Sequence, residues 1–327
     1  MCEGMAINRI NGEAPIELQS GNRTAASSAG SKRFSRELPL HLLLLPGVLL
    51  VFIYSYIPMF GVVIAFQKFI PAFGVFKSKW VGLENFEYVL MLPDMFQVVW
   101  NTLYIATLKI VFGLFVPIVI ALLLNEVISN KFKRTVQTLI YLPHFLSWII
   151  LGGIMVDILS PSEGIVNQLL GYFGIEPIYF LGDNAWFPFT LVVSDVWKEF
   201  GFNTIVYLAA LTSINPSLYE AAVIDGANRW KQTLHITLPG MLPIIILLAT
   251  LSLGNVLNAG FDQVFNLYSP AVYESGDIID TMVYRIGLIE AQYSVATVIG
   301  LFKSVVSLIM ISLSYWLAYR FANYRIF

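Results

Sequence analysis

Residues 215–239 read NPSLYEAAVIDGANRWKQTLHITLP, and the first half of this stretch predicts a short helix. Asn215 is a favoured N-cap residue, and Pro216 suits the first helical position because that position needs no backbone N–H donor. The helix should continue through the Glu-Ala-Ala triplet at 220–222. Gly226 then permits the left-handed backbone conformation that commonly ends a helix.

The second half of the stretch predicts another short helix, over about 228–235. This helix should end before Leu238 and Pro239, because the residue that precedes a proline is pushed out of helical geometry. Long apolar runs flank the stretch at 186–210 and 242–261. Two short helices that meet at a glycine would therefore form a compact projection between two membrane spans. A soluble partner could bind this projection.

The composition indicates a membrane protein. Of 327 residues, 57% are hydrophobic and 12% are charged, whereas soluble domains have about 45–50% apolar and about 25% charged residues. The net charge of −2 is spread without a basic block, so no nucleic-acid partner is expected. The single cysteine, Cys2, can build neither a disulfide framework nor a cysteine-based metal site. No metal site is predicted.

Six apolar runs reach the roughly 20 residues that a helix needs to cross about 30 Å of hydrocarbon. They cover residues 40–66, 98–125, 135–159, 186–210, 242–261 and 297–318. We therefore expect an all-α membrane domain of six transmembrane helices over residues 39–327. The first run follows several cations, as a signal peptide does, but it is too long and lacks a small-residue cleavage site.

The distribution of cations predicts the orientation. With a cytoplasmic N-terminus, the outer segments carry only Lys68, Lys77, Lys79 and Arg285. The inner segments then carry Arg9, Arg23, Lys32, Arg33, Arg36, Lys131, Lys133, Arg134, Arg229, Lys231, Arg320 and Arg325. Both termini are therefore expected in the cytoplasm. Residues 1–38 are predicted to be a disordered tail, because they are polar and have no apolar period up to about Ser31.

The loop between spans four and five resembles the EAA motif of binding-protein-dependent ABC importer permeases. The positions that carry the resemblance are Glu220, Ala221, Ala222, Asp225, Gly226, Ile236, Leu238 and Pro239. The resemblance implies a MetI-like permease fold in a bacterial cytoplasmic membrane. It also implies that residues 211–240 form coupling helices that dock in a cleft of an ATPase subunit. From the residues alone, an ordinary helix-turn-helix linker remains the alternative.

Other segments resemble the sugar branch of this family, and in particular the LplB-like permeases. These segments are Trp80-Val81-Gly82-Leu83-Glu84-Asn85-Phe86, Leu142-Pro143-His144-Phe145 with Ser147-Trp148, Ser160-Pro161-Ser162 with Gly164-Ile165-Val166-Asn167, and Leu218-Tyr219-Glu220-Ala221-Ala222. The resemblance implies import of an oligosaccharide cut from a plant or algal polysaccharide, including uronate-containing ones.

No nucleotide-binding motif is present. The sequence contains no G-x-x-x-x-G-K-[ST] loop, and no G-x-G-x-x-G or H-E-x-x-H pattern offers another chemistry. We therefore expect no enzyme activity and no cofactor in this chain, with ATP and Mg²⁺ held by a partner. The resemblance implies a second homologous permease in a heterodimer, two ATP-binding subunits and an extracytoplasmic solute-binding protein.

Polar residues inside the spans are the candidates for a translocation path, because such residues tend to face a bundle interior or a water-filled cavity. They are Lys109, Trp148, Asp195, Lys198, Glu199, Asn203, Asn255, Asn258, Asp262 and Lys303. Asp195, Glu199 and Asn203 recur every four residues and should share one helix face. The alternative is that opposite charges pair to hold helices together, which leaves the charge of the substrate open.

Two positions on span five suit sugar hydroxyls best. Asn255 and Asn258 carry amides, which both donate and accept hydrogen bonds without a buried net charge. With Asp262, they are predicted to lie on one helix face. Amides also bond across helix interfaces, which is the structural alternative for these residues.

A secondary transporter and a membrane enzyme are the other classes to weigh. A secondary transporter needs no docking projection and usually shows internal repeats or interrupted helices, which the sequence does not clearly indicate. An enzyme would need converging catalytic groups. The three histidines, His41, His144 and His235, lie far apart in the sequence and predict no such set.

Overall fold

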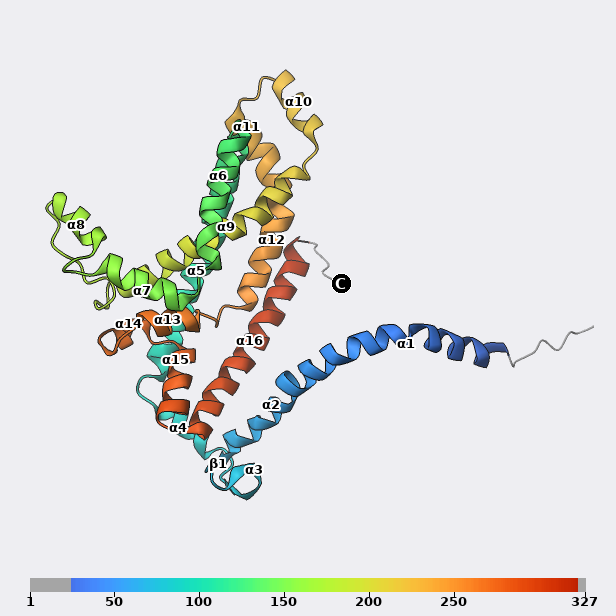
Figure 1. Cartoon of the computed structure of the whole chain (residues 1–327), viewed down its shortest axis with the longest axis vertical. Helices are drawn as coiled ribbons and strands as arrows, with labels where there is room; N and C mark the ends of the chain where they lie inside the picture. Colours follow the sequence, from blue (N-terminus) through green and yellow to red (C-terminus); the bar gives the residue numbers. More distant parts are fainter. Residues whose placement is uncertain (1–24, 323–327) are drawn as a thin grey trace, which may run out of the picture. The chain divides into compact units, whose positions relative to one another are not determined.

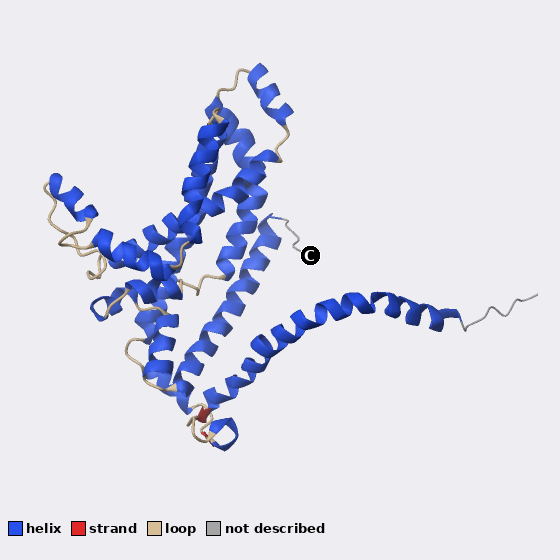
Figure 2. Ribbon diagram, viewed as in Figure 1, coloured by secondary structure: helices blue, strands red, loops and turns tan. Residues whose placement is uncertain are grey.

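The computed structural model describes residues 25–322 and is helical along most of them (Figure 2). The chain divides into two units, residues 1–60 and 61–327. The first unit contains one long helical stretch. The second contains the packed bundle.

The first unit is formed by one apolar helix with a change of winding. Its elements are α1 (Ala25–Val51), the π-helix η1 (Phe52–Tyr56) and α2 (Ile57–Met59). The 3-10 helix η2 (Phe60–Phe66) continues the run, so that residues 38–66 form a candidate membrane span. Because α1 begins at Ala25, the prediction of disorder is wrong for residues 25–38, where alanine, lysine and arginine favour helix. Residues 1–24 lie outside the described part.

The second unit contains three further candidate spans and one bent pair. Residues 95–126, 229–254 and 293–316 are long and apolar enough to cross a membrane. α9 (Phe187–Thr212) has 26 residues, which gives about 39 Å at 1.5 Å per residue. It carries three charged residues near its centre, and it is therefore less apolar than the candidate spans named above.

The predicted third span is broken. α6 (Asn130–Tyr141) continues into the 3-10 helix η3 (Leu142–Phe145), and α7 (Trp148–Leu159) then turns by 104°. The predicted span over 135–159 is therefore not one continuous helix. Pro143 lies in the tight turn, and the Ser147 hydroxyl accepts from the Ile150 N–H and caps the new helix.

The predicted fifth span also ends early. α12 (Leu238–Gly254) stops seven residues before the predicted end at Phe261, and non-helical backbone follows to Gly260, where φ is +91°. Five short elements then fold back into the bundle. They are α13 (Phe261–Leu267), η5 (Pro270–Val272), α14 (Tyr273–Gly276), α15 (Ile279–Tyr284) and η6 (Arg285–Ile289). Interrupted helices are thus present, and their apparent absence from the sequence cannot count against a secondary transporter.

The long helices of the second unit pack in pairs. α5 (Met95–Glu126) lies along α9, and α12 lies along α16 (Tyr293–Ala322) (Figure 1). α6 also packs on α9, while α15 and α4 (Glu84–Met91) pack on α16. Outside the loop at 215–239, the remaining elements are α3 (Gly74–Lys77), α8 (Ile165–Tyr172) and the antiparallel strands β1 (Gln67–Lys68) and β2 (Lys79–Trp80).

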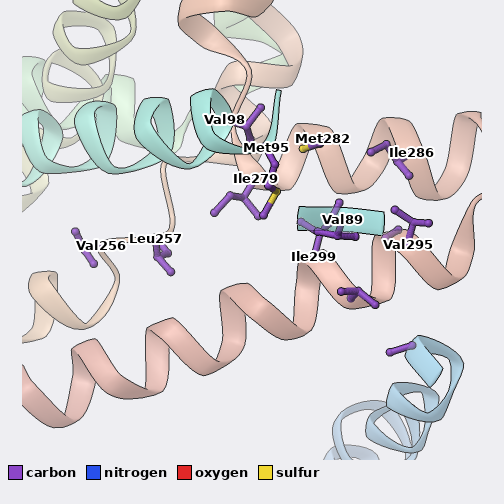
Figure 3. Close-up of a cluster of buried hydrophobic side chains, with 13 residues drawn as sticks. Val89, Met95, Val98, Val256, Leu257, Ile279, Met282, Ile286, Val295 and Ile299 are labelled. Atoms are coloured by element: carbon purple, nitrogen blue, oxygen red, sulfur yellow. The ribbon is translucent and has the colours of Figure 1, made fainter. Parts of the chain in front are cut away.

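Three apolar clusters hold the second unit together. The largest joins α4, α5, α15 and α16 through side chains such as Met95, Ile279 and Ile299 (Figure 3). A second cluster includes Ile105 of α5 and Leu191 of α9, and a third includes Tyr207 of α9. Along α5 and α9, the centre between the second and third clusters is therefore left free for polar residues.

Candidate functional site

The projecting loop forms as its local sequence predicts. The Asn215 side chain accepts from the Ser217 N–H at 3.0 Å and caps α10 (Pro216–Ile224). At the other end, the Ala227 N–H donates to the Ala222 carbonyl at 2.8 Å, and Gly226 has φ of +74°. This is a Schellman motif, in which the left-handed glycine satisfies the last helical carbonyls. The N-cap, the helix and the glycine break are confirmed.

The second half of the loop differs from the prediction. α11 (Arg229–Gln232), capped by Asn228, passes through the π-helix η4 (Thr233–Thr237) directly into α12. The expected end before Leu238 and Pro239 does not occur. A π-turn shifts the hydrogen-bond register by one residue, and this accommodates a proline that offers no N–H donor. The second helix is therefore the start of a membrane span.

The loop is braced against that span. The Tyr219 hydroxyl lies 3.0 Å from the Thr237 hydroxyl, and the Gln232 amide donates to the Ala227 carbonyl at 2.9 Å. Gln232 and Thr237 are buried. Because Tyr219 of α10 contacts Thr237 of η4, and η4 runs directly into α12, the loop can move together with α12.

The exposed surface of the loop combines large apolar side chains with the carboxylates of Glu220 and Asp225. Ile224 is 86% exposed and Trp230 is 73% exposed, with Leu218, Val223 and Leu234 also open to solvent. Of the motif residues, Glu220, Ala221, Asp225, Gly226 and Pro239 are exposed, whereas Ala222, Ile236 and Leu238 are half-buried. Figure 1 shows α10 at one end of the second unit, at the far end from α4. An exposed apolar patch of this kind marks a protein interaction surface.

A polar cavity of about 260 Å³ lies between α5, α9 and the segment that follows α12. Of the predicted path residues, it brings together Lys109, Asp195, Glu199, Asn203, Asn255 and Asn258. Asp195, Glu199 and Asn203 all line it, so the prediction that they share one face of α9 is confirmed. On α5 and α9, this cavity lies between the second and third apolar clusters.

The predicted face of Asn255, Asn258 and Asp262 on one helix is wrong. Asn255 caps the end of α12, Asn258 lies in the non-helical segment, and Asp262 belongs to α13. The two asparagines nevertheless reach one cavity, because the break folds the chain back towards α5. Asp262 instead lines a second cavity.

The second cavity, of about 460 Å³, lies at the bend between η3 and α7. It contains Trp148, Lys198 and Asp262 together with aromatic residues of α13. The Lys198 ammonium lies 5.8 Å from the centre of the Trp148 ring, which allows a cation–π contact. Lys303 lines neither of the two cavities, and it pairs with Asp280 at 2.5 Å.

The lysines predicted for the path are paired with carboxylates of the same chain. The Lys109 ammonium lies 3.4 Å from Asp195, and the Lys198 ammonium lies 2.9 Å from Glu199. The pair of Lys109 and Asp195 joins α5 to α9, as the structural alternative supposes, whereas Lys198 and Glu199 are neighbours on α9. Among the described residues, by contrast, the side chains of Asn203 and Asn258 make no hydrogen bond, so their amides remain available inside the cavity.

Two residues of this region were not predicted. His144 Nδ1 lies 2.7 Å from Glu199, although its sequence position gave no such indication. Gln263 is fully buried and bonds to α9, although it follows the predicted fifth span in the segment expected outside the membrane. The spacing of Gln263, Val264 and Leu267 is a helical core pattern that could have revealed a buried helix there.

Comparison with known proteins identifies the family. Residues 109–323 match the family described as "Binding-protein-dependent transport system inner membrane component". The chain belongs to this family. The chain is therefore a permease, a non-catalytic multi-pass membrane subunit of an ABC importer.

Two Bacillus subtilis (strain 168) permeases are similar over most of the chain. The polygalacturonan/rhamnogalacturonan transport system permease protein YteP is 42% identical over 88% of this chain and 90% of its own length. Protein LplB is 42% identical over 89% and 92%, respectively. The predicted resemblance to the sugar branch and to LplB-like permeases is confirmed.

Solved structures support the same fold. A bacterial ABC transporter involved in the import of the acidic polysaccharide alginate contains a chain that superposes with a TM-score of 0.82. That chain is 40% identical, and the match covers 89% of the permease and 98% of the solved chain. The MetI-like, all-α permease fold is thereby confirmed.

Proposed function

We propose that this permease forms one half of the translocation path of an ATP-driven importer for an oligosaccharide of the uronate-containing class. The support for the substrate class is the similarity to YteP and to the alginate transporter. The observation that carries the proposal is the polar cavity, because its free amides suit sugar hydroxyls. The nearby charges of Lys109 and Lys198 are balanced by Asp195 and Glu199.

Six spans carry this path, and both termini face the cytoplasm. α9 is the fourth span despite its charges, because Lys109 and Lys198 compensate the two carboxylates. The bent pair of α6 and α7 supplies the third. The loop at 215–239 then faces the cytoplasm, in agreement with the excess of lysine and arginine on that side.

A second homologous permease covers the open side of the cavity. The side chains of Asp195 and Glu199 are 26% and 32% exposed in this chain alone, near the middle of α9. Exposing carboxylates to lipid at this depth is costly. A heterodimer with a water-filled path between its two halves removes that cost, because both carboxylates then face water or polar groups.

The energy comes from two copies of an ATP-binding subunit, which hold ATP and Mg²⁺. Their cleft receives the apolar surface around Ile224 and Trp230, with Glu220 bonding to a basic or backbone group. A solute-binding protein delivers the sugar from outside, as suggested by a transporter solved with an alginate pentasaccharide-bound periplasmic protein, whose matching chain is 39% identical.

The mechanism is alternating access. ATP-driven closure of the two ATPase subunits pulls the coupling loops together, and the bracing through Tyr219 and Thr237 carries this movement into α12. The end of α12 bears Asn255 at the cavity, so that movement of the loop changes the path directly. ATP hydrolysis then resets the complex.

Replacing Glu220 by alanine tests the coupling role. We expect a normally assembled complex in which transport per ATP hydrolysed falls about tenfold, because a charge-assisted hydrogen bond contributes about 1.5–3 kcal/mol. The measurement is uptake and ATPase activity of the purified complex in proteoliposomes with loaded binding protein. Glu126→Ala, which removes an exposed carboxylate at the end of α5, is the matched control and should leave coupling unchanged. Wild-type coupling in Glu220→Ala would rule out this role.

A further inference from the structure

Lys109 lies where three separate parts of the bundle meet. Its ammonium donates to the Ala259 carbonyl at 2.6 Å and to the Gln263 side-chain oxygen, and it lies 3.4 Å from Asp195. The residue is buried, near the middle of α5. A single side chain thus connects α5 with α9, with α13 and with the non-helical segment 255–260.

That segment carries Asn255 and Asn258 into the polar cavity. Non-helical backbone at membrane depth is tolerated only where its polar groups find partners or line a cavity. The Asn258 N–H donates to the Asn255 carbonyl at 2.8 Å, and the carbonyl of the next residue, Ala259, accepts from the Lys109 ammonium. Lys109 therefore satisfies backbone that no helix satisfies.

The glycine after this carbonyl leaves room for the lysine. Gly260 has φ of +91°, and a Cβ added there would lie 3.0 Å from the Lys109 nitrogen. Any side chain at this position would be strained and would crowd the ammonium. The backbone turn and the lysine are thus fitted to each other.

Gln263 extends the same connection to α9. Its oxygen accepts from Lys109, and its nitrogen donates to the Leu191 carbonyl at 2.7 Å and to the Ser194 hydroxyl at 2.8 Å. Both polar atoms of this fully buried amide are therefore satisfied. A buried network whose members are all satisfied is rigid and specifies one arrangement.

We propose that Lys109 is a positioning residue that holds segment 255–260 so that Asn255 and Asn258 face the substrate. This inference rests on the proposed function of the cavity as part of the sugar path. In this arrangement the positive charge of Lys109 is compensated within the protein, because Asp195, Gln263 and the Ala259 carbonyl surround the ammonium. Lys109 then offers no free charge to a uronate carboxylate, and the two asparagine amides select by hydroxyl pattern.

Replacing Lys109 by methionine tests the proposal in the complete reconstituted importer. Methionine preserves much of the length and the apolar stem but removes the donor to Ala259. We expect the apparent KM for oligosaccharide transport to rise about tenfold with kcat changed less, because sugar-contacting amides lose their alignment. Asp195→Asn retains the bonds from Lys109 to Ala259 and Gln263, so it should raise KM by less than Lys109→Met.

A second readout follows the segment itself. In a Cys2→Ser background, a cysteine at Asn258 reports through its rate of reaction with a thiol reagent. We expect Lys109→Met to change this rate several-fold. Lys303→Met is the matched control, because Lys303 is also a paired lysine of a membrane helix but lines neither cavity. It should change neither the labelling rate nor KM.

The outcomes separate the two proposals. Unchanged KM and unchanged labelling in Lys109→Met overturn the positioning role, and so does an equal effect of Lys303→Met on labelling. If Asn258→Ala leaves transport KM unchanged in an otherwise wild-type chain, the assignment of this segment to the sugar path fails instead. The labelling rate of the Asn258→Cys chain still tests Lys109 in that case.

Discussion

Replacing Gly226 by proline is expected to reduce ATP-driven uptake on the order of a hundredfold. Gly226 has φ of +74°, whereas proline fixes φ near −65°, and the Gly226 N–H that donates to the Val223 carbonyl is lost. Such a mismatch costs about 3 kcal/mol or more, which converts to roughly a hundredfold in an equilibrium. Uptake by the reconstituted complex, with co-purification of the ATPase, measures the effect.

Gly226→Asn is the matched control for this prediction. Asparagine tolerates the left-handed conformation, and a Cβ at this position meets nothing within 4 Å. We therefore expect nearly wild-type uptake. Equal damage by asparagine and proline would contradict the account, since it would show that size or sequence, and not backbone conformation, makes glycine necessary.

Replacing Gly201 by alanine is expected to prevent close packing of α6 on α9. A Cβ at Gly201 would collide with the Ile140 carbonyl oxygen and lie 2.5 Å from the carbonyl carbon. Both are backbone atoms and cannot rotate away. The helices must separate at a cost of about 3 kcal/mol. We expect most of the protein to be lost from the monodisperse fraction after detergent extraction and mild heating.

Gly300→Ala supplies the comparison for this packing prediction. Gly300 lies within α16, where a Cβ meets nothing within 4 Å. The Gly300→Ala protein should be extracted by detergent and survive mild heating as the wild type does. Equal stability of the two variants would show that α6 and α9 do not approach each other as closely as the structure indicates.

Local signals explain which parts of the fold the sequence predicts. The α10 helix follows from Asn215, Pro216 and Gly226, because caps, prolines and glycines act over a few residues. The continuation through Pro239 was missed because a π-turn is set by register and not by residue type. The break after Gly254 was missed because its partner, Lys109, lies far away in the sequence.

In the candidate site, too, positions set by local spacing were predictable, and positions set by distant contacts were not. The spacing of Asp195, Glu199 and Asn203 revealed their common face, since a helix converts spacing into direction. Spacing failed for Asn255, Asn258 and Asp262 because no continuous helix joins them. Composition also could not tell whether lysine charges face the substrate or the protein, and only the distances to Asp195 and Glu199 decide this.

Cross-linking tests the central claim most directly, namely that the 215–239 loop is gripped by a separate ATPase on the cytoplasmic side. A single cysteine replaces Ala221 in a Cys2→Ser chain, and the assembled importer is treated with a short cross-linker that joins a thiol to an amine and is then denatured. The account predicts a covalent product between this permease and the ATPase subunit, with a yield that changes when ATP is bound. Absence of that product, together with labelling of the cysteine from outside intact cells, would contradict the account.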